Sequence, residues 1–373
     1  MKKVNPTIQA LNTIGQSIWY DNLSLEVLRS GELEGLVNQG VSGLTSNPTI
    51  FKKAIADTDH YDDSIRELVQ GEISTDDLLE ELMVRDVGAA ADLLRATYDS
   101  SDGLEGYASI EVSPVLANDT VGTIQAAKRI WAKLNRPNIM IKIPATAAGI
   151  PAIQQTLSSG ISVNVTLIFS VEVYSQVVQA YLNGLQELGD SSKLPYVASV
   201  ASFFVSRVDS AVEARLDKLS NVPSGSREKL LGAVGIANSK MAYSHFLEVF
   251  NSSEFQELAS KGARVQRPLW ASTGVKNPTY GELLYVKALA GRNTVNTLPP
   301  KTLNALLEGA DIKAEVESGF KEASACLSLL REVGIELEDV LTELQEQGVD
   351  AFRQSYDELI SAIDEKRKRI AAK

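Results

Sequence analysis

One lysine lies within an apolar segment of the chain. Lys142 interrupts the run Asn138-Ile-Met-Ile-Lys-Ile-Pro-Ala-Thr146, which otherwise has the composition of a strand buried on both faces. An ammonium group that leaves water without a partner carries a large energetic cost, so this side chain must meet a carboxylate or lose its proton. A neutral, desolvated lysine is a nucleophile that can attack a carbonyl group and form a Schiff base. The alternative is a stem lying along the strand with its amine in water at the strand end.

Other short apolar segments of the chain carry polar residues at or near their ends. The segment Ser17-Ile-Trp-Tyr-Asp21 ends on a carboxylate, and Tyr107-Ala-Ser-Ile-Glu-Val-Ser113 carries Glu111. In the segment 162–169, alternation with period 2 places Asn164 and Thr166 on the same face. Three further polar residues at segment ends are Asn47, Ser202 and Ser272. Each could instead cap the helix that follows, and this alternative is strongest for Asn47 and Ser272.

The segments that position these residues alternate between strands and helices. Strands are predicted at 17–21, 43–48, 107–113, 138–146, 162–169, 196–204, 267–273 and 293–298. Helices are predicted at 1–16, 25–39, 48–98 with a break near 71–75, 120–134, 149–157, 171–188, 205–261 with a break at 221–225, 279–290, and from 299 onward. The charged end at 364–369 is predicted to be a solvated face or a frayed tail.

Regular alternation of strands and helices predicts a parallel sheet, and eight strands favour an α/β fold of the (β/α)8 (TIM) barrel type. We expect a single barrel domain over residues 1–373, with a leading helix at 1–16 and a C-terminal helical extension at 299–373 packed on the barrel. An open, doubly wound sheet is the alternative, but the chain has no glycine-rich dinucleotide loop after its first strand and no GxxxxGK[ST] motif. Because active-site groups of such barrels lie at the carboxyl ends of the strands, the polar strand ends should converge around Lys142 and favour the Schiff-base hypothesis.

Composition excludes several classes of function. The 373 residues are 44% hydrophobic and carry a net charge of -12, which leaves no broad basic surface, so no nucleic-acid partner is expected. Cys326 is the only cysteine, and His60 and His245 are the only histidines, so we expect neither a disulfide nor a metal site. No apolar run approaches the length of a membrane span, so we expect no membrane partner and a cytoplasmic protein.

Four segments, in this order, resemble the transaldolase family, and in particular its longer bacterial and cyanobacterial-type members. They are 43–51, 109–114, 139–146 and 164–169, within a resemblance that extends from about Ile18 to Leu298. The resemblance implies a (β/α)8 barrel that needs no cofactor. It also implies an enzyme of the pentose phosphate pathway that transfers a dihydroxyacetone unit from sedoheptulose 7-phosphate or fructose 6-phosphate to glyceraldehyde 3-phosphate or erythrose 4-phosphate.

The resemblance also implies roles for individual residues. Lys142 matches the Schiff-base lysine, and Asp21 matches the general base that takes the proton of the C4 hydroxyl. Glu111 and Thr166 match the pair that holds a water molecule and relays protons. The residues that match substrate-binding positions are Asn47, Asn164, Ser202, Phe204, Arg207 and Ser272.

The second phosphate-binding residue departs from the family pattern. Many members carry an arginine after the seventh strand, whereas this chain has Lys276, at a different spacing after Ser272. Lys276 can supply charge but not a bidentate fork of donors. The alternative is that Lys276 is an exposed loop lysine, with no part in the site.

Two other functions are open at this point. A fructose-6-phosphate aldolase shares the fold and the lysine, but the resemblance implies a glutamine in place of Glu111 and a tyrosine in place of Phe204 in such relatives. The second is a barrel that has lost catalysis and serves as a binding scaffold. The joint presence of Asp21, Glu111, Lys142 and Thr166 argues against a scaffold.

Overall fold

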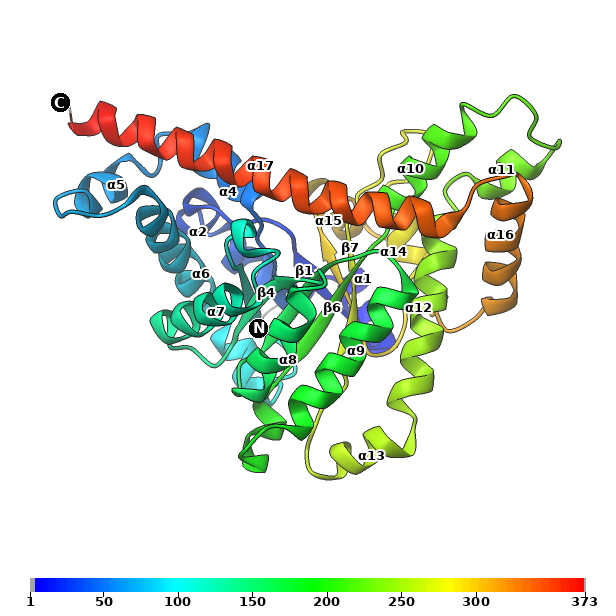
Figure 1. The fold of residues 1–373 in the computed structure, drawn as a ribbon, viewed down its shortest axis with the longest axis horizontal. Helices are drawn as coiled ribbons and strands as arrows, with labels where there is room; N and C mark the ends of the chain where they lie inside the picture. Colours follow the sequence, from blue (N-terminus) through cyan, green and yellow to red (C-terminus); the bar gives the residue numbers. More distant parts are fainter. Residues whose placement is uncertain (1–3, 372–373) are drawn as a thin grey trace.

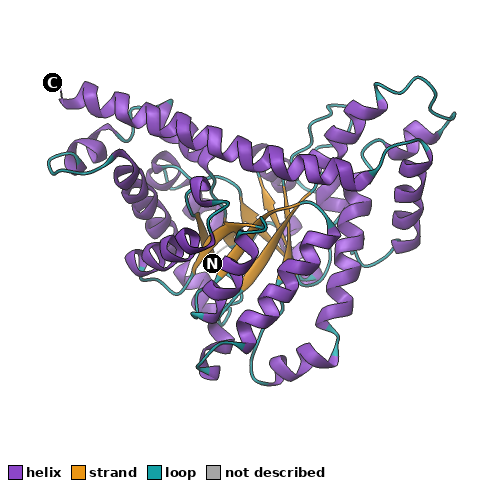
Figure 2. Ribbon diagram, viewed as in Figure 1, coloured by secondary structure: helices purple, strands orange, loops and turns teal. Residues whose placement is uncertain are grey.

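The computed structural model describes residues 4–371, in which eight parallel strands close into a barrel surrounded by helices (Figures 1 and 2). Each strand pairs with the next along the chain, and the last pairs with the first, so the predicted (β/α)8 barrel is confirmed and the open sheet is excluded. The strands are β1 Gln16–Tyr20, β2 Gly43–Leu44, β3 Tyr107–Glu111, β4 Ile139–Pro144, β5 Val163–Ile168, β6 Ser199–Phe204, β7 Arg267–Ala271 and β8 Thr294–Leu298.

Helices follow every strand, and extra helices lie at both ends of the chain. The helices are α1 Pro6–Ile14, α2 Leu25–Arg29, α3 Glu32–Asn38, α4 Pro48–Ala56, α5 Asp62–Leu68, α6 Thr75–Ser100, α7 Thr120–Leu134, α8 Gly149–Ser158, α9 Val171–Gln186, α10 Ser206–Leu216, α11 Ser226–Leu230, α12 Val234–Phe250, α13 Ser253–Ser260, α14 Leu284–Ala288, α15 Pro300–Glu308, α16 Phe320–Glu332 and α17 Leu337–Ala371. Two short 3-10 helices are η1 Pro114–Leu116 and η2 Ser191–Tyr196. Residues 1–3 of the predicted leading helix and residues 372–373 of the extension lie outside the described residues.

Several predicted elements are shorter or more divided than expected. The helix predicted at 25–39 breaks at Gly31, whose φ of 79° is left-handed, and the helix at 48–98 has a further break between α4 and α5. The helix predicted at 279–290 begins only at Leu284, because the Asn277 side chain accepts hydrogen bonds from the backbone and hydroxyl of Thr279 and holds a turn there. The region 205–261 contains four helices, where only one break was predicted.

Alternation along the strands gives the barrel two apolar layers. Ile139, Ile141 and Ile143 of β4 pack in the layer between the sheet and the surrounding helices. Met140 of the same strand belongs to a second cluster, which fills the barrel with residues such as Trp19 of β1. Because side chains two residues apart point the same way, Lys142 follows Met140 toward the barrel axis.

The amino-terminal end of the barrel is closed by a buried ion pair. Arg267 Nη1 lies 2.6 Å from Glu105 Oε1, and both side chains are almost fully buried. The hydroxyl of Ser17 and the hydroxyl of Ser42 donate to the same carboxylate over 2.5 and 2.8 Å. The pair is therefore well supplied with hydrogen bonds, as a buried pair must be.

The long helix α17 crosses the carboxyl ends of the strands, from the side of α10 to the side of α5 (Figure 1). Its charged end is helical rather than frayed, and Glu365, Lys368 and Arg369 are exposed as a solvated face would be, but the prediction does not hold for Lys366. Lys366 is only 7% exposed and its Nζ lies 3.1 Å from Asp62, while Arg369 pairs with Asp59 and Asp62. These contacts join the end of α17 to the segment around α5. Because the two segments lie near opposite ends of the chain, no local sequence pattern could predict this contact. Among residues 4–371, no helix is both long and apolar enough to cross a membrane.

Candidate active site

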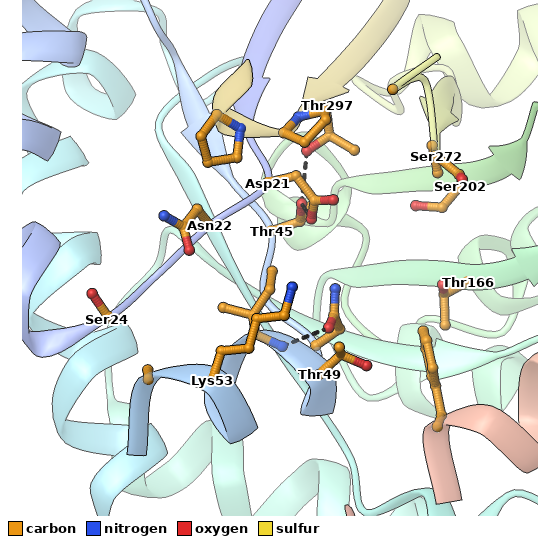
Figure 3. Close-up of a pocket in the computed structure, with 18 of the residues that line it drawn as sticks. Asp21, Asn22, Ser24, Thr45, Thr49, Lys53, Thr166, Ser202, Ser272 and Thr297 are labelled. Atoms are coloured by element: carbon orange, nitrogen blue, oxygen red, sulfur yellow. Dashed lines mark hydrogen bonds between the residues drawn. The ribbon is translucent and has the colours of Figure 1, made fainter. Parts of the chain in front are cut away.

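A cavity of about 540 Å³ opens at the carboxyl end of the barrel (Figure 3). Its wall includes polar residues that follow or end different strands, as expected for the catalytic end of this fold. The predicted residues in this wall are Asp21, Asn47, Lys142, Thr166, Ser202, Phe204, Arg207, Ser272 and Lys276. Nine of the eleven predicted site residues therefore meet in one place.

Lys142 is buried and faces a carboxylate. It lies directly beside Glu111 in the register of β3 and β4, and its Nζ is 3.2 Å from Glu111 Oε2. The same amine donates a hydrogen bond to the carbonyl oxygen of Ser46 over 3.1 Å. Only 5% of Lys142 is exposed, so the alternative of an amine in open water at the strand end is wrong.

Glu111, which contacts this amine, and Thr166, which lines the same cavity as Lys142, are both buried. Burial raises the pKa of Glu111, and the charge of Asp21 adds to this effect while Lys142 opposes it. Thr166 points inward two residues beyond Asn164 on β5, and its hydroxyl has no hydrogen-bond partner among residues 4–371. A buried hydroxyl without a partner is suited to binding a group that enters the site.

Asp21 comes directly after β1 and points into the cavity (Figure 3). Thr45 Oγ1 donates to Asp21 Oδ1 over 2.8 Å, and Thr297 Oγ1 lies 2.7 Å from Thr45 Oγ1, so the two hydroxyls form a chain to the carboxylate. Burial raises the pKa of Asp21, while Lys142, Thr45, Lys276 and Arg207 lower it. Thr45 and Thr297 were not predicted as site residues, although both are polar residues in predicted strands.

Asn164 lies behind the cavity wall. Its side chain accepts a hydrogen bond from Ser202 Oγ over 2.7 Å and donates one to Ser109 Oγ over 3.1 Å. Ser202 itself reaches the cavity, whereas Asn164 and Glu111 are not part of its wall. Asn164 therefore fixes the Ser202 hydroxyl in this structure.

Asn47 has both of the roles that its sequence position allowed. Its Oδ1 accepts a hydrogen bond from the backbone N–H of Ile50 over 3.0 Å, which caps α4. The same residue lines the cavity, and its amide nitrogen makes no hydrogen bond to another residue between 4 and 371. The cap thus holds the asparagine with its donor group available to a ligand.

Two cations line the cavity near α10 and the loop after β7. Arg207 lies in the first turn of α10, with its Cζ 5.2 Å from the centre of the Phe204 ring, and Lys276 is exposed in the loop. Burial lowers the pKa of Arg207, but a guanidinium remains charged in proteins. Ser272 has a left-handed φ of 54°, and its hydroxyl lies 3.1 Å from that of Ser206.

One carboxylate joins the two segments that carry these cations. Glu213 of α10 accepts hydrogen bonds from Tyr280 over 2.5 Å and from Asn277 over 3.2 Å. Asn277 directly follows Lys276 in the chain. The loop that carries Lys276 is therefore fixed to the helix that carries Arg207.

The fold and the site together are typical of a (β/α)8-barrel enzyme with its active site at the carboxyl ends of the strands. A buried lysine stands beside one carboxylate, a second carboxylate lines the same cavity, and so do the cations Lys53, Arg207 and Lys276. Among the described residues, no group of three or more His, Cys, Asp or Glu side chains is arranged to hold a metal ion.

Comparison with known proteins identifies the family. Residues 18–363 match the Transaldolase/Fructose-6-phosphate aldolase family, to which this chain belongs. It is 45% identical to a protein named transaldolase from Saccharopolyspora erythraea, over 97% of this chain and 98% of that protein. It is 46% identical to a transaldolase from Mycolicibacterium smegmatis and 43% identical to transaldolase 2 from Nostoc sp., each over 96% of both chains.

Proposed function

We propose that this protein is a transaldolase, which transfers a dihydroxyacetone unit between sugar phosphates through a Schiff base on Lys142. The observation that carries the proposal is the buried pair of Lys142 and Glu111, 3.2 Å apart, beside a cavity that Asp21 also lines. The donor is sedoheptulose 7-phosphate or fructose 6-phosphate, and the acceptor is glyceraldehyde 3-phosphate or erythrose 4-phosphate. These are reactions of the pentose phosphate pathway.

The first half of the reaction forms the imine and breaks the sugar chain. The Lys142 amine attacks the C2 ketone, and the resulting carbinolamine loses water to give a protonated imine. Asp21 then takes the proton of the C4 hydroxyl, the C3–C4 bond breaks, and its electron pair moves into the imine. An aldose phosphate leaves, and the three-carbon unit remains on Lys142 as an enamine. The raised pKa of Asp21 suits it to this proton transfer.

The second half reverses these steps with another aldose. The enamine carbon attacks the aldehyde of the acceptor, and Asp21 returns its proton to the new C4 hydroxyl. Water then adds to the imine, and the carbinolamine collapses to release the ketose and the free amine. Glu111 and Thr166 are the groups we assign to proton transfer with this water, because Glu111 contacts the amine, Thr166 lines the same cavity with an unpaired hydroxyl among residues 4–371, and burial raises the pKa of Glu111.

The remaining polar residues bind the substrate. Arg207 offers a fork of donors to the phosphate group, and Lys276 adds a second positive charge from the adjacent loop. Asn47 and Ser202 hydrogen-bond the hydroxyls of the retained fragment, with Asn164 holding Ser202 in place. Phe204 and Ser272 complete the wall at the phosphate end.

An aldolase that releases free dihydroxyacetone is the second candidate, since the family includes fructose-6-phosphate aldolases. Glu111 in place of a glutamine and Phe204 in place of a tyrosine favour the transferase. All three relatives described above are named transaldolases, which supports the same conclusion.

Dependence on an acceptor distinguishes the two functions. The purified protein is incubated with fructose 6-phosphate, with and without erythrose 4-phosphate, and both sedoheptulose 7-phosphate and free dihydroxyacetone are measured. We expect rapid formation of sedoheptulose 7-phosphate and little free dihydroxyacetone, with Lys142→Met as the inactive control. Rapid turnover without the acceptor, with dihydroxyacetone as the product, would show an aldolase instead.

A further inference from the structure

The amine of Lys142 is covered by an aromatic ring from the far end of the chain. Phe352 lies on α17, and the centre of its ring is 5.6 Å from Lys142 Nζ. The ring lines the same cavity as the site residues and is 5% exposed. This distance is within the range of a cation–π interaction with a protonated amine or imine.

The part of α17 that carries this ring is fixed from several directions. Gln345 Nε2 donates to the carbonyl oxygen of Ala145, at the end of β4, over 2.7 Å. Gly348 allows close approach to β5, because a Cβ at this position would lie 3.0 Å from a methyl group of Leu167. On the other side of Phe352, the hydroxyl of Ser355 lies 3.0 Å from that of Thr49 on α4. The ring is therefore held over the amine by contacts on both sides, within one to two turns of the helix.

A ring that covers the Lys142 amine matters at one step of the proposed reaction, when the enamine waits for an acceptor. After the aldose phosphate leaves, the enamine on Lys142 must persist until an acceptor arrives. If its nucleophilic carbon takes a proton from water, the enamine becomes the imine of dihydroxyacetone. A second water molecule can then add to C2, and collapse of the carbinolamine gives free dihydroxyacetone and the free lysine amine. Exclusion of water from the covalent intermediate prevents this loss.

We propose that Phe352 shields the Lys142 nitrogen and thereby determines whether the three-carbon unit is transferred or released as dihydroxyacetone. Phe352 is therefore a specificity-determining residue, and its ring lies on the side of the amine that faces α17. Glu111 and Ser46 already contact the amine. This inference rests on the proposed transaldolase function.

The test measures the partition between transfer and release. Phe352→Ala is compared with the wild type at saturating fructose 6-phosphate and limiting erythrose 4-phosphate, and free dihydroxyacetone and sedoheptulose 7-phosphate are both measured. We expect the ratio of release to transfer to rise by roughly tenfold in Phe352→Ala, because water reaches the intermediate. Phe352→Leu keeps an apolar cover of smaller size, so its ratio should lie between the two.

Ile363→Ala is the matched control on the same helix. Ile363 is fully buried on α17, but it lines neither this cavity nor the neighbouring one that includes Glu111, so its truncation weakens helix packing without uncovering the amine. We expect its ratio of release to transfer to equal that of the wild type. Circular dichroism and thermal melting verify that each variant is folded. Should Phe352→Ala not fold, Phe352→Leu and Ile363→Ala provide the same comparison.

Two results would overturn the inference. One is an unchanged ratio in a folded Phe352 variant that still transfers the three-carbon unit. The other is an equal rise in Ile363→Ala, since general loosening of α17 would then be the cause. Failure of the proposed function itself looks different, because the wild type would then give no transfer product at all.

Discussion

Thr45 Oγ1 donates a hydrogen bond to Asp21 Oδ1 over 2.8 Å, and the hydroxyl of Thr297 lies 2.7 Å from that of Thr45. Thr45 follows β2 and Thr297 belongs to β8, so the two neighbours of β1 in the barrel orient the carboxylate that follows β1. The hydrogen bond stabilises the ionised form of Asp21 and opposes the effect of burial on its pKa.

Removal of this hydrogen bond should change the pH dependence of activity. A general base works only when it is unprotonated, so kcat/KM falls as the pH drops through the pKa of Asp21. Thr45→Val removes a group that lowers this pKa, so the acidic limb of the profile should move to higher pH. A hydrogen bond to a charged group contributes about 1.5–3 kcal/mol, so activity on that limb should fall by roughly ten- to a hundredfold.

Thr156→Val is the control for this profile. Thr156 is a buried threonine on α8 whose hydroxyl donates to the Ala152 carbonyl, away from the site. Its pH profile should match that of the wild type. A limb that stays in place in Thr45→Val, or moves to lower pH, would contradict the assignment of Asp21 as the base.

Substitution of Arg207 or Lys276, the residues proposed to bind the phosphate group, should affect only phosphorylated substrates. Arg207→Lys keeps the charge but loses the fork of donors, and we expect KM for fructose 6-phosphate to rise by roughly tenfold. Lys276→Met should raise KM less, because Lys276 is exposed and its charge is screened by solvent. The same variants are assayed at high concentration with unphosphorylated fructose. An equal loss with fructose would show that these residues do not act through the phosphate group.

Stability should depend strongly on the ion pair at the other end of the barrel. Glu105→Gln leaves the Arg267 charge buried without its partner, which should lower the free energy of unfolding by about 3–5 kcal/mol. Glu358→Gln is the matched control, because Glu358 pairs with Lys52 on the surface, where solvent screens the pair and the loss should be much smaller. Urea denaturation measures both. Similar losses in the two variants would mean that the buried pair does not stabilise the barrel.

The position of Lys142 could be predicted from the sequence because the signal is local. Each barrel strand is a short apolar run with period 2, and the polar residues at the strand ends must meet where the sheet closes. Asp21 and Thr166 reach the cavity for this reason. The same pattern does not separate residues in the cavity wall from those one layer behind it, which is why Asn164 lies deeper than expected.

The contributions of α17 could not be predicted, because they depend on contacts between segments far apart in the chain. Phe352 looks like an ordinary apolar residue of an amphipathic helix until α17 is placed across the barrel. Lys366 similarly appears to belong to a solvated charge run until Asp62 is found beside it. Neither partner can be identified from spacing along the sequence.

Borohydride trapping tests directly whether Lys142 forms the covalent intermediate. The protein is treated with borohydride in the presence of fructose 6-phosphate, digested with trypsin, and analysed by mass spectrometry. We expect a reduced adduct on Lys142 in the wild type, none in Lys142→Ala, and an adduct with slow cleavage in Asp21→Ala. An adduct on another lysine, or none on folded wild-type protein, would contradict the account.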